Sequence, residues 1–235
     1  MKVKTKFLLG IVAAALSASA VTAHAAVKIT EVAAWGSSTS NPAIPYASDW
    51  FELTNTGTSA VNITGWKMDD NSNSFALAVA LTGISSIAAG ESVIFTESAV
   101  TASFLSTWFG AASPSGLQIG TYTGSGVGLS STADAVNIFN ASGILQANVT
   151  FGAADAISPY QTFDNAAGLN NTAISQLSVV GTNGAFVAAN HAIEIGSPGT
   201  IAAAVPEPES YAMMLAGLGL LGFAARRKKQ QSGTV

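Results

Sequence analysis

The chain has 235 residues, of which 49% are hydrophobic and only 9% are charged, and its formal net charge is −4. An apolar chain with so little charge is not intrinsically disordered, and the lack of cysteine excludes disulfide bonds, cysteine-ligated metal sites and a thiol nucleophile. The charge is unevenly spread, because residues 26–205 contain two lysines and eleven acids whereas the other basic residues lie at the two ends.

The N-terminus has the pattern of a secretory signal. Three lysines in the first six positions precede an apolar stretch over residues 7–16, and small residues then lead to Ala23-His24-Ala25. We expect cleavage after Ala25, so that residues 1–25 are a signal peptide and the mature chain begins at Ala26 or Val27. The alternative, a first transmembrane helix, is disfavoured because the apolar run is short for spanning a bilayer.

Residues 26–204 read as one all-β domain. Apolar and polar residues alternate with a period of two, which predicts short strands that each bury one face, and turn signals rich in Gly and Asn separate them. Many short strands at such spacing are typical of a sandwich or barrel. The alternation is clearest at residues 50–54, 61–63, 93–95, 136–138, 145–151 and 177–179.

One segment of this domain has helical spacing instead. Val100, Phe104 and Trp108 recur every four residues within Ser98–Phe109, and Gly110 follows. We therefore predict one short helix over residues 98–109, capped at its start by Ser98 or Thr101 and ended by the glycine.

The C-terminus combines three features in a fixed order. Val205-Pro206-Glu207-Pro208 precedes the uncharged stretch 211–225, and the run Arg226-Arg227-Lys228-Lys229 follows. Fifteen helical residues span about 22 Å, less than the ~30 Å hydrocarbon core, but a short helix can insert by bilayer thinning and by snorkelling of its basic flank. We predict a transmembrane helix at 211–225 with the basic run in the cytoplasm.

This arrangement over residues 205–229 resembles the PEP-CTERM sorting signal. The resemblance implies processing by an exosortase, a membrane-embedded cysteine transpeptidase, in a Gram-negative bacterium that makes exopolysaccharide. It also implies transient residence in the inner membrane and delivery to the cell surface or extracellular matrix. The alternative is an ordinary tail anchor, so removal or retention of the tail stays open. Residues 230–235 form a short remaining tail.

The domain itself resembles the lamin tail domain. The similar segments are Ile29–Val32, Asp49–Gly57, Val61–Trp66, Ile87–Phe95, Asp134–Phe139 with the hairpin to Gly152, and the closing motif Ile195–Gly199. The resemblance covers about residues 28–200 and implies an immunoglobulin-like β-sandwich. Known bacterial members are exported, and some accompany hydrolases or nucleases.

The residues give little sign of catalysis. His191 is the only histidine of the mature chain, no G-x-S-x-G motif occurs, and we interpret this histidine as a solvated or locally bonded loop residue. Glu31, Asp49 and Glu52 could form the carboxylate pair of a glycoside hydrolase. We favour the alternative that they are strand-edge acids that solubilise a β-face and deter edge pairing. We therefore predict no catalytic residue.

No metal or cofactor site is predicted. Asp69, Asn71 and Asn73 have the alternate spacing of a calcium loop, but an EF-hand would need a glycine where Ser74 stands and a glutamate where Ala80 stands. A polar turn is the favoured interpretation, and a looser calcium site stays open.

Two of the four tryptophans are candidate ligand contacts. Trp66 and Trp108 lie in apolar patterns and are expected in the core, whereas Trp35 lies in a loop rich in Gly and Ser, and Trp50 alternates with Phe51 and Leu53. We predict that Trp35 and Trp50 form an exposed aromatic platform.

Together these features predict an exported, exosortase-sorted surface or matrix protein that is not an enzyme. Its sandwich would be an interaction module for exopolysaccharide or other surface proteins. The alternative is a glycan-acting enzyme, or an accessory module of an extracellular hydrolase or nuclease. Nucleic acid is not an expected partner. Two lysines and eleven acids give residues 26–205 a net negative charge, which should repel phosphates.

Overall fold

The computed structural model describes residues 27–37, 43–124, 126–154, 158–165, 173–200 and Leu218. The predicted signal peptide (1–25) and terminal tail (230–235) lie outside this part of the chain, as does the predicted sorting signal (205–229) apart from that leucine. The chain divides into two units, Met1–Ala202 and Ala203–Val235, and the first contains the folded domain. Within the described residues, no helix is both long enough and apolar enough to cross a membrane.

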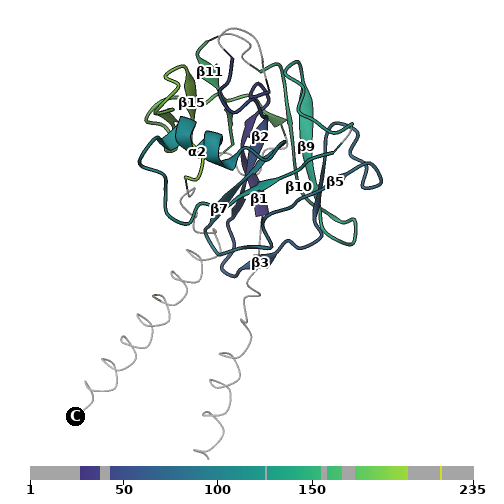
Figure 1. The fold of residues 1–235 in the computed structure, drawn as a ribbon. Coiled ribbons are helices and arrows are strands. Elements are labelled where there is room, and N and C mark those ends of the chain that lie inside the picture. The colour runs from purple at the N-terminus through teal and green to yellow at the C-terminus, as the bar shows by residue number, and fades with distance from the viewer. Residues whose placement is uncertain are drawn as a thin grey trace, which may run out of the picture. The chain divides into compact units, whose positions relative to one another are not determined.

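The domain consists of short strands and one helix, as the period of the sequence predicts (Figure 1). The elements in chain order are β1 (Val27–Ala33), β2 (Trp50–Asn55), β3 (Val61–Asn62), β4 (Lys67–Asp69), β5 (Val79–Ala80), β6 (Ser86–Ile87), β7 (Ser92–Thr96), α2 (Thr101–Phe109), β8 (Ile119–Thr121), β9 (Asp134–Phe139), β10 (Leu145–Phe151), β11 (Tyr160–Gln161), β12 (Phe163–Asp164), β13 (Ala173–Ile174), β14 (Phe186–Val187) and β15 (Glu194–Gly196).

Two five-stranded sheets form the sandwich. One has the order β12-β1-β2-β7-β8 and the other β13-β10-β9-β4-β5, and β1 packs against β10 across the interface. Most neighbouring strands are antiparallel, whereas β7 with β8 and β10 with β13 are parallel. Smaller sheets, β11-β15-β14 and β3-β6, complete the domain. The predicted all-β, immunoglobulin-like sandwich with one short helix is confirmed.

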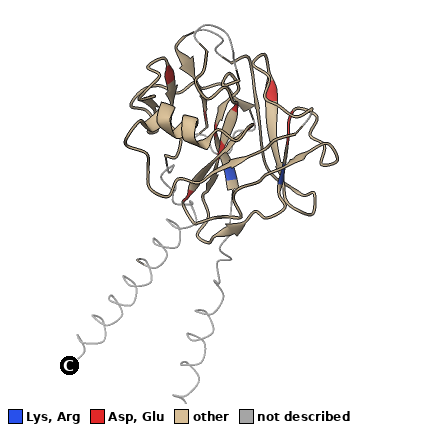
Figure 2. Cartoon of the chain, viewed as in Figure 1, with Lys and Arg blue, Asp and Glu red and all other residues tan. Residues whose placement is uncertain are grey.

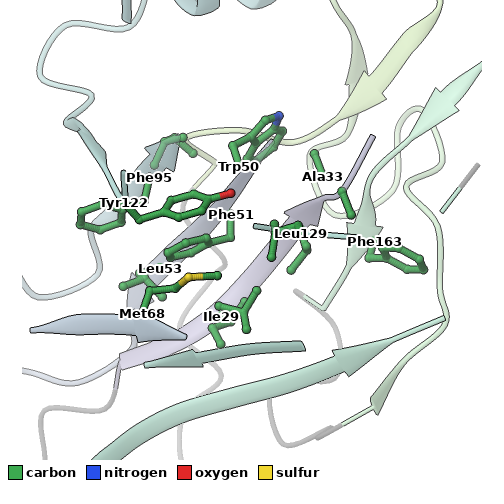
Figure 3. Close-up of a cluster of buried hydrophobic side chains, with 14 of the residues drawn as sticks. Ile29, Ala33, Trp50, Phe51, Leu53, Met68, Phe95, Tyr122, Leu129 and Phe163 are labelled. Atoms are coloured by element: carbon green, nitrogen blue, oxygen red, sulfur yellow. The ribbon is translucent and has the colours of Figure 1, made fainter. Parts of the chain in front are cut away.

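The apolar core lies between the two large sheets (Figure 3). Ile29 of β1, Phe51 and Leu53 of β2 and Phe95 of β7 point into it, and each is at most 2% exposed. Met68 of β4 enters from the second sheet. Removing such side chains from water stabilises a domain by roughly 1.5–3 kcal/mol each, so this layer supplies most of the drive to fold.

Helix α2 agrees with the predicted segment, with corrected ends. It begins at Thr101, its N-cap residue is Val100, and no side chain caps it, so the predicted cap by Ser98 or Thr101 is wrong. Gly110 ends the helix as predicted, with a positive φ of 58°. The helix buries Phe104 and Trp108, and its position is therefore set by packing rather than by a cap.

The prediction that each strand buries only one face is wrong for β2. All six of its residues are buried. Phe51 and Leu53 face the core, while Trp50 packs edge-on against Phe104 of α2 at a centroid distance of 5.5 Å and Glu52 accepts a hydrogen bond from the backbone of Gly199. The helix and the C-terminal part of the domain therefore cover the second face of the sheet.

Candidate functional site

The acidic residues of the domain point inward. Seven of them are at most 8% exposed: Glu31, Asp49, Glu52, Asp69, Asp134, Asp164 and Glu194. The interpretation of Glu31, Asp49 and Glu52 as solvent-facing strand-edge acids is therefore wrong. A buried carboxylate needs hydrogen-bond donors, and serine and threonine hydroxyls together with backbone N–H groups provide them here.

Glu31 and Glu52 lie opposite each other on β1 and β2. Glu31 Oε1 accepts hydrogen bonds from the Thr162 hydroxyl at 2.5 Å and from the Ser197 backbone N–H at 2.7 Å. The Ser197 hydroxyl donates to the other oxygen, Oε2, at 3.1 Å. This carboxylate thus connects the first strand of the domain to its C-terminal segment.

Glu52 has an equivalent set of donors. Its Oε1 accepts from the Thr30 hydroxyl at 2.5 Å, and its Oε2 accepts from the Gly199 backbone N–H at 2.7 Å. Thr30 and Thr54 are also within hydrogen-bond distance of each other, at 2.9 Å between their hydroxyl oxygens. A continuous polar layer therefore runs across the outer face of β1 and β2.

Burial changes the protonation of this pair. It raises the pKa of Glu31 to about 7, to which the nearby charge of Asp164 contributes, and it raises the pKa of Glu52 well above its usual value, with a further increase from the charge of Glu31. Ionising both of two adjacent buried carboxyls costs much free energy, so the pair keeps at least one proton at neutral pH. With exposures of 0% and 2%, neither side chain reaches solvent or a substrate in this structure.

His191 belongs to a second buried chain of polar groups. Its Nδ1 lies 2.5 Å from Glu194 Oε1, and the Tyr46 hydroxyl donates to Glu194 Oε2 at 2.6 Å. Trp50 Nε1 donates to the Tyr46 oxygen at 3.2 Å. Burial raises the pKa of Glu194 and, together with the charge of that glutamate, the pKa of Tyr46. The interpretation of His191 as a locally bonded loop histidine is confirmed, because its carboxylate partner, Glu194, is only three residues further on, at the start of β15.

Within the Asp69–Ser74 segment, an Asp69 side-chain oxygen accepts hydrogen bonds from other residues of the same segment. Asp69 Oδ2 accepts from the Ser72 hydroxyl and from the Ser74 N–H, both at 2.6 Å, which is the geometry of a polar turn. Asp69 Oδ1 is buried without a hydrogen-bond partner, but Ca²⁺ takes six to eight oxygens. Across the described ranges, no group of three His, Asp or Glu side chains could hold a metal ion.

The predicted exposed platform of Trp35 and Trp50 is wrong. Their side chains are 2% and 0% exposed. Trp35 stacks on Tyr160 at a centroid distance of 5.3 Å and donates through Nε1 to the Gln161 carbonyl, so β11 covers it. The Gly- and Ser-rich residues next to Trp35 do not indicate that it is buried, because the strand that covers it, β11, is more than a hundred residues further along the chain.

The exterior of the domain is nearly free of charge. No charged side chain among the described residues is exposed; Lys28, Lys67, Asp70, Glu91 and Glu97 are half-buried and the other seven are buried. The acidic positions in Figure 2 lie mainly on the strands, and most of the ribbon carries no charge. Since charged residues are the most exposed class in ordinary soluble domains, this distribution is inverted. Ser, Thr, Ala, Gly and Asn make up most of the exposed positions.

Comparison with known families agrees with this architecture. The model of the Lamin Tail Domain family matches residues 20–153, more than half of the chain. The model of the PEP-CTERM protein-sorting motif matches residues 204–228. No curated protein gives a significant match. The family match ends at residue 153, so the resemblance expected up to about residue 200, with the closing motif Ile195–Gly199 that contains Ser197, extends beyond it. The family match therefore gives no role to Thr162 or Glu194.

Proposed function

The chain belongs to the lamin tail domain family and ends in a PEP-CTERM sorting motif, and on this basis we propose that its sandwich is a non-catalytic module that contacts uncharged, hydroxyl-rich polymers outside the cell. The sorting motif implies export, processing by an exosortase and delivery to the cell surface. We propose exopolysaccharide as this polymer, because the resemblance to the PEP-CTERM signal implies a host that makes it.

The proposed route follows the order of the segments. The signal peptide 1–25 directs export and is removed after Ala25, and the apolar stretch 211–225 then holds the protein transiently in the inner membrane. Arg226 and Arg227 stay on the cytoplasmic side, and Val205-Pro206-Glu207-Pro208 stands on the outer side for the exosortase. The domain over residues 26–204 is thereby left outside the membrane.

The uncharged exterior is the observation that carries the choice of polymer. A surface made mainly of small hydroxyl, amide and methyl groups, with only five half-buried charged side chains in the described residues, offers few partners to a polyanion or polycation. It can, however, hydrogen-bond to sugar hydroxyls over a wide area. The predicted repulsion of nucleic acid by eleven acids loses its basis, since seven of these acids are buried. The expectation of no nucleic-acid binding rests instead on having only two half-buried lysines to neutralise phosphates in the described domain.

The rival function, glycan hydrolysis, has one supporting observation. A carboxyl with a pKa of about 7, such as Glu31, has the protonation that a general acid needs. However, Glu31 and Glu52 are closed off by Thr162, Ser197 and Gly199, whereas a glycosidase must bring both carboxyls to the sugar. The arrangement therefore favours a structural role for the pair.

Affinity electrophoresis tests the proposal. The mature protein should be retarded in gels that contain a neutral polysaccharide such as dextran, and the retardation should be equal at low and high salt because no charges are involved. It should migrate freely through gels containing alginate or duplex DNA. Retardation by alginate or DNA alone, with a steep dependence on salt, would contradict the proposal, and release of reducing sugar from the glycan would support the enzyme.

A further inference from the structure

The chain after the last strand is held without strand pairing. β15 ends at Gly196, yet Ser197 is 4% exposed and Pro198 is also buried. The backbone N–H groups of Ser197 and Gly199 donate to Glu31 and Glu52, respectively, each at 2.7 Å. Two side chains of the first sheet therefore replace the ladder of hydrogen bonds that a further strand would have provided.

We infer that Glu31 and Glu52 act as a latch for residues 197–200, and that this latch sets the point up to which the chain is held in the fold before the sorting motif begins. The inference concerns the attachment of the segment that precedes the motif, and it does not depend on which polymer the domain binds. Both glutamates are positioning residues, since they act through the backbone of the latched segment.

Close approach of the backbone supports the latch. A Cβ atom at Gly196 would lie 2.6 Å from Glu31 Oε1 and 2.9 Å from a ring carbon of Trp108, so only glycine fits at this position. Glycine at position 196 therefore leaves room for the backbone to pass close to the Glu31 carboxyl.

A hydroxyl relay extends the latch to its last residue. Thr54 lies 2.6 Å from Ser92, measured between their hydroxyl oxygens, and the Ser92 hydroxyl donates to the Thr200 carbonyl at 3.1 Å. Thr200 N–H donates back to the Ser197 carbonyl at 3.0 Å, which closes the segment into a turn. Every residue from 197 to 200 except the proline therefore has a backbone group bound within this network.

The end of the latch lies close in sequence to the sorting motif. The motif match begins at residue 204, so only three residues, 201–203, separate it from the last latched residue, Thr200. An enzyme that processes an extended peptide cannot use a stretch whose N–H groups are already bound to buried carboxyls. The latch therefore limits the accessible peptide on its N-terminal side to residues from about 201 onward.

Hydrogen exchange with limited proteolysis on the full chain in detergent tests the latch. In the wild type, peptides covering 196–200 should be protected from exchange and proteinase K should not cut within 196–200. In Glu31→Ala/Glu52→Ala, exchange of these amides should rise about tenfold or more and cleavage should extend into 196–200, with β9 and β10 still protected. Glu31→Gln/Glu52→Gln keeps one acceptor oxygen on each side chain and should show a smaller rise.

Two further variants keep the result interpretable. Glu91→Gln is the matched control, because Glu91 also accepts one backbone N–H, from Ala88, and one side-chain N–H, from Gln118, but lies outside the latch. Ser197→Ala removes only the hydroxyl bond to Glu31 and remains informative if the double alanine variant does not fold. Unchanged exchange at 196–200 in folded Gln and Ser197→Ala variants, or an equal rise in the control, would overturn the latch. Failure of surface sorting or of polymer binding would leave these readouts unaffected.

Discussion

The two faces of the sheet β12-β1-β2-β7-β8 are both buried, but by different means. The inner face buries apolar side chains such as Phe51 and Leu53 against the second sheet. Apolar contacts of this kind do not depend on the orientation of particular atoms. The outer face buries Glu52 and Thr54 beneath α2 and the C-terminal residues, where each polar atom requires a donor in a fixed place. The inner face thus stabilises the fold, while the outer face determines which segment covers it.

Disrupting the apolar core between the two sheets, against which the inner face packs, should give the largest effect. Val149→Asp places an unpaired charge at a position that is 2% exposed, which costs several kcal/mol, so the domain should unfold or lose most of its thermal stability. Circular dichroism during heating measures this. Gln146→Asp, at an exposed position of the same strand, should change stability by at most about 0.5 kcal/mol. A Val149→Asp domain that melts like the wild type would show that β10 does not face the core.

The outer face should make stability depend on pH. The folded-state pKa of Glu31 is about 7 and that of Asp49 about 6, both above their usual values because of burial. The folded state therefore binds protons more tightly than the unfolded state. The free energy of unfolding should fall as pH rises from about 4.5 to about 7, by up to about 1.4 kcal/mol per pH unit for each such carboxyl.

Urea denaturation at pH 5 and pH 8 measures this slope. Glu31→Gln should flatten it, since the amide does not titrate. Greater stability at pH 8 than at pH 5 would mean that the buried pair is held as two carboxylates.

Removing one donor from the outer face should have an intermediate effect. Thr162→Val keeps the shape of the side chain but removes the hydroxyl that bonds Glu31 and lies 2.6 Å from the Ser178 hydroxyl oxygen. Leaving a buried carboxyl short of a donor costs about 1–3 kcal/mol. Chemical denaturation should show this loss, while Thr123→Val, at an exposed site, should show almost none.

The smallest effect is expected at Trp35, which β11 covers. Trp35→Phe keeps an aromatic ring on Tyr160 and removes the hydrogen bond from Nε1 to the Gln161 carbonyl. A loss of about 1 kcal/mol should follow, with no change in retardation by dextran, because the ring is buried. A clear loss of polymer binding without a loss of stability would restore this residue as a ligand contact.

The apolar layers could be predicted from the sequence, because their signal is local. Val149 and Phe151 alternate with polar neighbours along β10, and Phe104 and Trp108 share one side of the helix that covers the outer face and that a glycine ends. The polar contacts of the outer face could not be predicted in this way. The donors to Glu31 lie 131 and 166 residues further along the chain, and Tyr46 meets Glu194 across 148 residues.

A strand that carries a glutamate looks solvent-exposed on one face until its covering segment is known. For this reason the sequence pattern predicts exposed side chains at four positions that the structure shows to be buried: Glu31, Glu52, Trp35 and Trp50. The family resemblance predicted the sandwich and a closing motif at Ile195–Gly199, but it did not indicate that this segment would cover Glu31 and Glu52.

The burial of the acids also has a consequence for a layer built from many copies of this domain. Residues 26–205 contain two lysines and eleven acids, so each copy has a formal net negative charge even though seven of the acids are buried. This charge requires counterions wherever the acids lie, and the osmotic pressure of counterions depends on the external salt. A coat of this domain should therefore swell in dilute medium and shrink in brine, although few charged side chains reach its surface.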